Sequence, residues 1–150
     1  MDFDALLKEA SRYESRLRAH RRALHHIPEL GYEEHETHAY LMEHLRALAP
    51  DDLKTFARTG IRAVFRGDGT GRVIAFRSDI DALPIQEATG RDYASCHSGK
   101  MHACGHDCHM AMMLGAVHLL LGIRDQLHGE VRVLFQPAEE ISVGSRKMIA

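Results

Sequence analysis

The chain has 150 residues, of which 45% are hydrophobic and 27% charged, with a formal net charge of −2. This length suits one domain with a buried core, and the balance of residues is that of an ordinary globular protein. The charge gives no indication of a nucleic-acid-binding surface, and no apolar run reaches the roughly 18 residues of a membrane span. The start, Met1–Asp4, carries no apolar signal core, and the odd number of cysteines argues against a disulfide framework. We therefore expect a cytoplasmic protein with neither nucleic acid nor membrane as a partner.

The first fifty residues predict two helices. Residues Asp4–His26 carry apolar side chains at helical spacing among many charges, and Pro28 ends this segment. The segment 28–34 is predicted as a turn, and Glu36–Leu48 as a second helix that Pro50 closes. Histidines on these polar helical stretches are expected to be solvated: His20, His25, His26, His35, His38 and His44.

The remainder predicts strands alternating with helices, which indicates an α/β fold. Gly60–Arg66 and Val73–Arg77 are β-rich runs on either side of a glycine-rich segment, a pattern typical of a hairpin. Downstream, a buried helix is predicted over Met110–Gln126, a strand over Glu130–Gln136 and the start of a helix over Ser142–Ala150.

Three polar clusters flank these core elements, at residues 79–81, 102–109 and 139–140. Polar groups just past the ends of strands are where open α/β sheets place their sites. We therefore expect the three loops to converge at one edge of the sheet.

The cluster at 102–109 is the richest in possible metal ligands. Cys104 and His106 stand two residues apart, so their side chains point to one side if this segment is extended, and Gly105 lets the backbone bend between them. A thiolate beside an imidazole suits Zn, Mn, Co or Ni better than Mg or Ca. Two alternatives are a structural zinc site and a redox thiol pair. A structural zinc site normally needs a second Cys/His pair, which this sequence lacks. A redox thiol pair fits poorly, because Cys104 and Cys108 are not spaced as a Cys-x-x-Cys motif.

Each of the other clusters has an ordinary explanation when it is taken alone. Asp79 and Asp81 could cap a turn, and Glu139–Glu140 could be the acidic first turn of a helix. Together with the Cys/His cluster, however, they predict a metallohydrolase. In such a site one carboxylate binds the metal, and its neighbour acts as general base toward a water whose pKa the metal lowers.

Four segments of the chain carry a specific resemblance: LHHIPELGYEE at 24–34, RSDIDALPI at 77–85, GKMHACGHD at 99–107 and FQPAEE at 135–140. They resemble the N-terminal part of the M20 metallopeptidase family and occur in the family's order. They are similar to its amidohydrolase branch, which includes hippurate hydrolases, N-acyl-amino-acid amidohydrolases and auxin-conjugate hydrolases.

This resemblance implies roles for individual residues. Cys104, His106 and Glu140 match metal ligands, which would hold one or two divalent transition metal ions. Glu139 matches the catalytic base, and Asp81 matches a strand-end aspartate that orients a ligand. Asp107 is expected to support the site without binding metal. Cys108 is not expected to be a ligand.

The resemblance also implies the zinc-peptidase-like catalytic domain, in which helices pack on a mixed β-sheet. Residues 1–150 would be the N-terminal portion of that domain, ending before the inserted dimerisation domain and before two further metal-ligating histidines of the family. Catalytic sites normally have three protein ligands per metal, so two metals would need more ligands than the three matched here, and we expect this chain alone to be inactive. Full-length relatives are expected to be homo-oligomeric.

The activity implied by the resemblance is hydrolysis of the amide bond of an N-acylated amino acid, of the hippurate or N-acetyl-amino-acid type. Two alternatives stay open: an M20-type dipeptidase or aminopeptidase, and a non-catalytic metal-binding remnant. The loop Cys104–His106 favours the amidohydrolase branch, because the peptidase branches typically place an aspartate in this region.

Overall fold

Four strands form one mixed sheet in the computed structural model, which describes residues 3–149. The order is β1-β2-β4-β3, and only β3 and β4 run parallel. The expected α/β fold with helices on a mixed sheet is therefore confirmed. The strands are β1 Asp52–Phe56, β2 Gly60–Arg66, β3 Val73–Asp79 and β4 Glu130–Gln136.

The predicted hairpin between β2 and β3 is wrong, because β4 lies between these two strands. β2 instead forms a hairpin with β1, a strand that the sequence pattern did not predict. The glycine-rich segment crosses the start of β4: the Gly67 N–H donates to the Gly129 carbonyl at 2.8 Å. A Cβ on Gly71 would lie 2.2 Å from the His128 carbonyl oxygen. Gly67 and Gly71 thus serve a close backbone crossing, whereas Gly69, with φ of 81° and no atom near its Cβ position, serves the bend between them.

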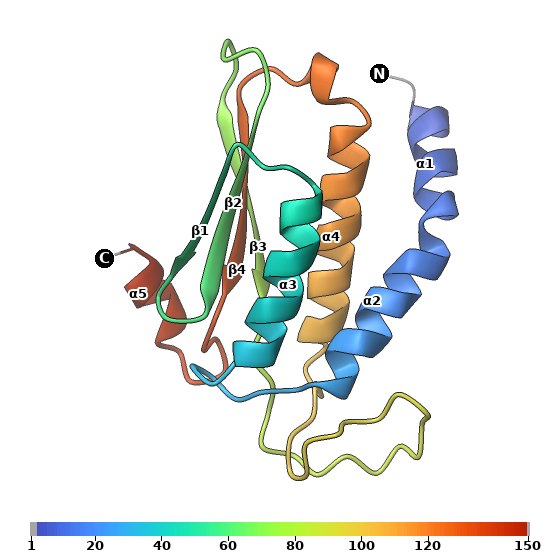
Figure 1. The fold of residues 1–150 in the computed structure, drawn as a ribbon, viewed down its shortest axis with the longest axis vertical. Helices are drawn as coiled ribbons and strands as arrows, with labels where there is room; N and C mark the ends of the chain where they lie inside the picture. The colour runs from blue at the N-terminus through green and yellow to red at the C-terminus, as the bar shows by residue number, and fades with distance from the viewer. Residues whose placement is uncertain (1–2, 150) are drawn as a thin grey trace.

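Helices α3 and α4 lie on one face of the sheet, and α1 and α2 pack along α4, while the short α5 lies beside β4 (Figure 1). No helix within residues 3–149 is long and apolar enough to cross a membrane. The helices are α1 Phe3–Arg12, α2 Glu14–His26, α3 His35–Ala47, α4 His106–Leu121 and α5 Gly144–Ile149, with a 3-10 turn η1 at Arg124–Gln126.

The helix predicted over Asp4–His26 is divided at Tyr13. The Tyr13 N–H donates to the Ala10 carbonyl, three residues back, at 3.0 Å. The Tyr13 ring lies edge-on to His118 of α4, with ring centroids 4.2 Å apart. The tightened turn redirects the chain, so that α1 and α2 both stay against α4.

The other helices differ from expectation mainly at their ends. α3 begins one residue earlier than predicted, and α4 begins at His106, four residues before the apolar run at Met110. α4 ends at Leu121, before the predicted Gln126. The last helix begins at Gly144, and the predicted end at Ala150 lies outside the described residues.

The core lies between the sheet and the helices that cover it. Alternate residues of β2 and β4 face the helices, as the period of a strand requires. Two of them, Phe65 and Phe135, are among the largest fully buried side chains. The core cluster also holds Leu24, Leu41, Leu45, Ile61, Ala63, Met110, Leu114, Val117, Val131 and Val133.

Strand β3 is an edge of the sheet with apolar side chains in solvent. Ile74 and Phe76 are 54% and 46% exposed. An edge strand with unpaired backbone groups and apolar side chains is a template for pairing with another chain.

We expect residues 1–150 to associate in a concentration-dependent way, and Phe76→Lys to reduce this association in sedimentation velocity. Met112→Lys, at a 57% exposed position on α4, is the matched control and should leave it unchanged. Equal association of both variants would contradict the role of β3.

Candidate metal centre

The three polar loops meet beyond the carboxyl ends of β3 and β4. Asp79 at the end of β3 pairs in register with Gln136 at the end of β4. Because parallel strands end at the same edge of a sheet, the residues that follow them emerge together. The third loop enters here through the first turn of α4.

The structure brings Cys104, His106 and Glu140 together. Each offers one ligand atom, and these atoms lie within 4.8 Å of one another. The convergence does not arise from an extended segment, since His106 is already the first residue of α4. It arises because Gly105, with φ of 88°, turns the chain into the helix through a left-handed conformation.

Asp81 is fully buried and contacts two of these three residues. The His106 Nδ1–H donates to the Asp81 carbonyl at 2.8 Å, and the Glu140 N–H donates to Asp81 Oδ2 at 3.0 Å. The hydrogen bond from Nδ1 fixes the tautomer of His106 and leaves its Nε2 free to bind a metal ion. Nε2 lies 3.8 Å from both Glu139 Oε2 and Glu140 Oε1.

The electrostatics of the site favour a bound cation. Burial alone would lower the pKa of His106, but hydrogen bonds to Asp81 and its charge outweigh burial and raise the pKa to about 9. Glu140 raises the pKa of the Cys104 thiol by accepting its hydrogen bond and by its charge. Within residues 3–149, three buried carboxylate oxygens have no hydrogen-bond partner: Asp79 Oδ1, Asp81 Oδ1 and Glu140 Oε1. Such unpaired carboxylate oxygens fit a divalent metal ion.

A second group of possible ligands adjoins the first and was missed in the sequence. Asp79, His106 and His109 also offer ligand atoms within 4.8 Å of one another, and His106 belongs to both groups. Two signals could have found them. Asp79 and Asp81 are two residues apart at a strand end, and His106 and His109 are three apart on a helix, so each pair shares one side.

Three potential ligands of the 102–109 cluster lie outside both groups found among the described residues: His102, Asp107 and Cys108. His102 is buried, and burial lowers its pKa to about 4. Cys108 lies in α4, and its N–H donates to Asp107 Oδ1 at 2.8 Å.

The expectation that His25 is solvated is wrong. It is 3% exposed, and its Nδ1–H donates to Asp107 Oδ2 at 2.7 Å. Arg21 Nε forms an ion pair with the same oxygen at 2.8 Å. Asp107 therefore ties the first turn of α4 to α2, which gives it the supporting place that was expected. The hydrogen bond to Asp107 is a structural reason for His25 in the matching segment at 24–34.

Glu34 is a second supporting residue that the sequence did not reveal. It is fully buried and accepts the Ala138 N–H at 2.9 Å and the Thr59 hydroxyl at 2.5 Å. Ala138 has φ of 53°, an uncommon conformation for a residue with a side chain. Glu34 thus holds the backbone in the turn that presents Glu139 and Glu140.

We expect Glu34→Ala to weaken metal binding by residues 1–150 about 10–100-fold, because the loop that carries Glu140 loses its anchor. Zinc affinity measured by competition with a chromophoric chelator checks this. The control is Glu33→Ala, since Glu33 is exposed and contacts Lys100 at 3.2 Å. Unchanged zinc affinity in Glu34→Ala would show that the loop needs no such anchor.

Comparison with known families identifies the chain. A sequence model of peptidase family M20/M25/M40 matches residues 75–150. This range contains Cys104, His106 and Glu140, together with Asp81 and Glu139. The chain belongs to this family, so the resemblance seen in the four segments is confirmed.

The chain is 49% identical over 139 residues to N-acetyl-L-cysteine deacetylase of Bacillus subtilis strain 168. It is 47% identical over 131 residues to N-acetyldiaminopimelate deacetylase of Oceanobacillus iheyensis. These matches cover 93% and 86% of this chain but 33% and 34% of the relatives, so the chain spans about a third of their length. A crystal structure from B. subtilis, described as a dinuclear metal-binding peptidase of the M20 family, is similar with a TM-score of 0.87 and 44% identity. This match covers 93% of this chain and 39% of that one.

Proposed function

We propose that residues 1–150 are the N-terminal portion of the catalytic domain of a metal-dependent amidohydrolase, which cleaves the amide bond of N-acylated amino acids. The observation that carries this proposal is the cluster of Cys104, His106 and Glu140, with Glu139 beside it, at one edge of the sheet. The names of two similar relatives, both deacetylases of N-acetylated amino acids, support this class of substrate.

Cys104, His106 and Glu140 would hold one divalent ion, with zinc, manganese, cobalt and nickel as the metals that suit this mixed ligand set. Asp79 and His109 would contribute to a second ion next to it. When bound, the metal ion would act as a Lewis acid, which polarises the amide carbonyl and lowers the pKa of the attacking water.

The two neighbouring glutamates have different environments, which supports different roles. The Glu139 side chain is 39% exposed and that of Glu140 18% exposed. Glu140 is held through its backbone by Asp81, as a fixed ligand requires. Glu139 is open to solvent, so it can take a proton from the attacking water and deliver it to the leaving amine.

We also propose that the protein works in the cytoplasm. Its three cysteines, Cys96, Cys104 and Cys108, are free and exposed. Unbridged exposed thiols suit a reducing compartment.

To test this proposal, a fusion protein is made in which residues 1–150 replace the matched third of the B. subtilis deacetylase and the rest of that enzyme follows. This fusion protein is assayed with N-acetyl and N-benzoyl amino acids and with dipeptides. We expect turnover of the N-acyl amino acids by the fusion protein, and none by residues 1–150 alone. Turnover of dipeptides instead would indicate a peptidase. A folded, metal-loaded fusion protein that hydrolyses neither would indicate a non-catalytic metal-binding chain.

A further inference from the structure

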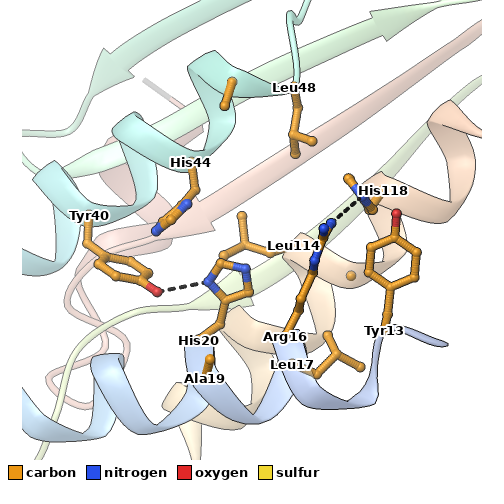
Figure 2. Close-up of a pocket in the computed structure, with 12 residues that line it drawn as sticks. Tyr13, Arg16, Leu17, Ala19, His20, Tyr40, His44, Leu48, Leu114 and His118 are labelled. Atoms are coloured by element: carbon orange, nitrogen blue, oxygen red, sulfur yellow. Dashed lines mark hydrogen bonds between the residues drawn. The ribbon is translucent and has the colours of Figure 1, made fainter. Parts of the chain in front are cut away.

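A cavity of about 460 Å³ lies between α2, α3 and α4, and none of the candidate metal ligands lines it. Figure 2 shows side chains from all three helices directed into it. This volume falls in the range of small-molecule sites. The lining residues are Tyr13, Arg16, Leu17, Ala19, His20, Tyr40, His44, Ala47, Leu48, Leu114, Gly115 and His118.

The cavity gathers three histidines and an arginine. The Arg16 Nη1–H donates to His118 Nε2 at 3.4 Å, and His20 Nδ1 is hydrogen-bonded to the Tyr40 hydroxyl at 2.8 Å (Figure 2). The rings of His20 and His44 lie edge to face, with centroids 4.7 Å apart. His20 and His44 were expected to be solvated, but each is only partly exposed, because both face the cavity.

The cavity lacks negative charge to balance these groups. No aspartate or glutamate is among its lining residues. Arg16 forms no ion pair with a carboxylate in the described part of the chain, whereas Arg18 on the same helix pairs with Glu14 at 2.7 Å. Burial and the nearby Arg16 lower the pKa of His118, and the charge of Glu9, which does not line the cavity, offsets only part of this effect. The cavity is therefore a place where an anion would be stabilised.

The walls of the cavity are apolar. Leu17 and Leu114 line it from α2 and α4, and Leu48 lines it from just past the end of α3. Gly115 brings α2 and α4 close, since a Cβ at this position would lie 2.4 Å from Leu17 Cδ2. A ligand must therefore combine an anionic group with an apolar body.

A metal ion does not fit these observations. Within residues 3–149, His20, His44 and His118 do not form a group of three ligand atoms in reach of one ion. The guanidinium of Arg16 beside His118 would also repel a cation.

We propose that this cavity binds a small aromatic carboxylate, with the carboxylate on Arg16 and the imidazole of His20, and the ring among Leu17, Leu48 and Leu114. Arg16 provides the planar pair of donors that a carboxylate accepts. The rings of Tyr13 and Tyr40 among the lining residues favour an aromatic body over an aliphatic one. This site is separate from the candidate metal centre and does not depend on the proposed activity.

The experiment uses residues 1–150 dialysed against a chelator, so that no metal can bind the probe. Benzoate and benzamide, which have similar shapes and differ in charge, are titrated by calorimetry and by NMR of the histidine rings. We expect benzoate to bind with a dissociation constant on the order of 1 mM and benzamide at least about 10-fold more weakly. The resonances of His20, His44 and His118 should shift, and that of His106 should not.

Arg16→Gln should weaken benzoate binding at least about 10-fold. Arg16→Lys should weaken benzoate binding less, because lysine keeps the positive charge. Arg18→Gln is the matched control on the solvent face of the same helix and should bind benzoate normally. Circular dichroism verifies that each variant is folded. Equal binding of benzoate and benzamide, shifts confined to His106, or normal benzoate binding by folded Arg16→Gln would each overturn the proposal.

Discussion

Glu139→Gln in the fusion protein is expected to lower the rate of amide hydrolysis by about 10²–10⁴-fold, the loss typical of removing a general base. The amide of glutamine has the shape of the carboxylate but cannot take a proton from water. Metal content should stay unchanged, because Cys104, His106 and Glu140 remain. Turnover numbers and elemental analysis of the same preparation check both halves of this expectation.

The neighbouring Glu140→Gln is the matched comparison, since it makes the same chemical change one residue away. Its backbone N–H would still bond to Asp81, but a carboxylate oxygen at the ligand cluster would be lost. Metal content should therefore fall in Glu140→Gln and not in Glu139→Gln. If both variants lost metal equally, or if Glu139→Gln turned over normally, the two roles would be wrongly assigned.

Cys104→Ala is expected to weaken cobalt binding by residues 1–150 by at least about 100-fold, more than the loss of a supporting contact causes. A thiolate bound to Co²⁺ gives a charge-transfer absorption band in the near ultraviolet, and this band should disappear. The geometric reason is that Cys104 lies in the ligand cluster, where its sulfur is within 4.8 Å of the ligand atoms of His106 and Glu140.

Cys108→Ala is the control for this experiment, and it should keep both the band and the affinity. Cys108 is also exposed, but its backbone bonds to Asp107 and its sulfur is in neither ligand group of the described residues. Equal losses of cobalt affinity in the two variants would contradict the assignment of Cys104 as the thiolate ligand. Retention of the band in Cys104→Ala would contradict it as well.

The sequence alone determined the elements whose signals are local. Strand β4 has the predicted bounds, Glu130–Gln136, because a β-rich run stands between a glycine and a proline. The positions of Cys104, His106 and the Glu139–Glu140 pair were also readable, since their residue types and order are typical of metal chemistry. Their roles stay predictions, although the structure brings all four to one edge of the sheet.

Only the tertiary structure decided how the strands pair and what supports the site. The turn signal at Gly67–Gly71 is satisfied equally by a hairpin and by a crossing over β4, and the difference lies in a strand sixty residues away. Likewise, His25 meets Asp107 across 82 residues, and Glu34 meets Ala138 across 104. A buried contact between such distant residues leaves no periodic pattern in the sequence, because helix and strand periods record only which face a residue occupies and not what lies against it.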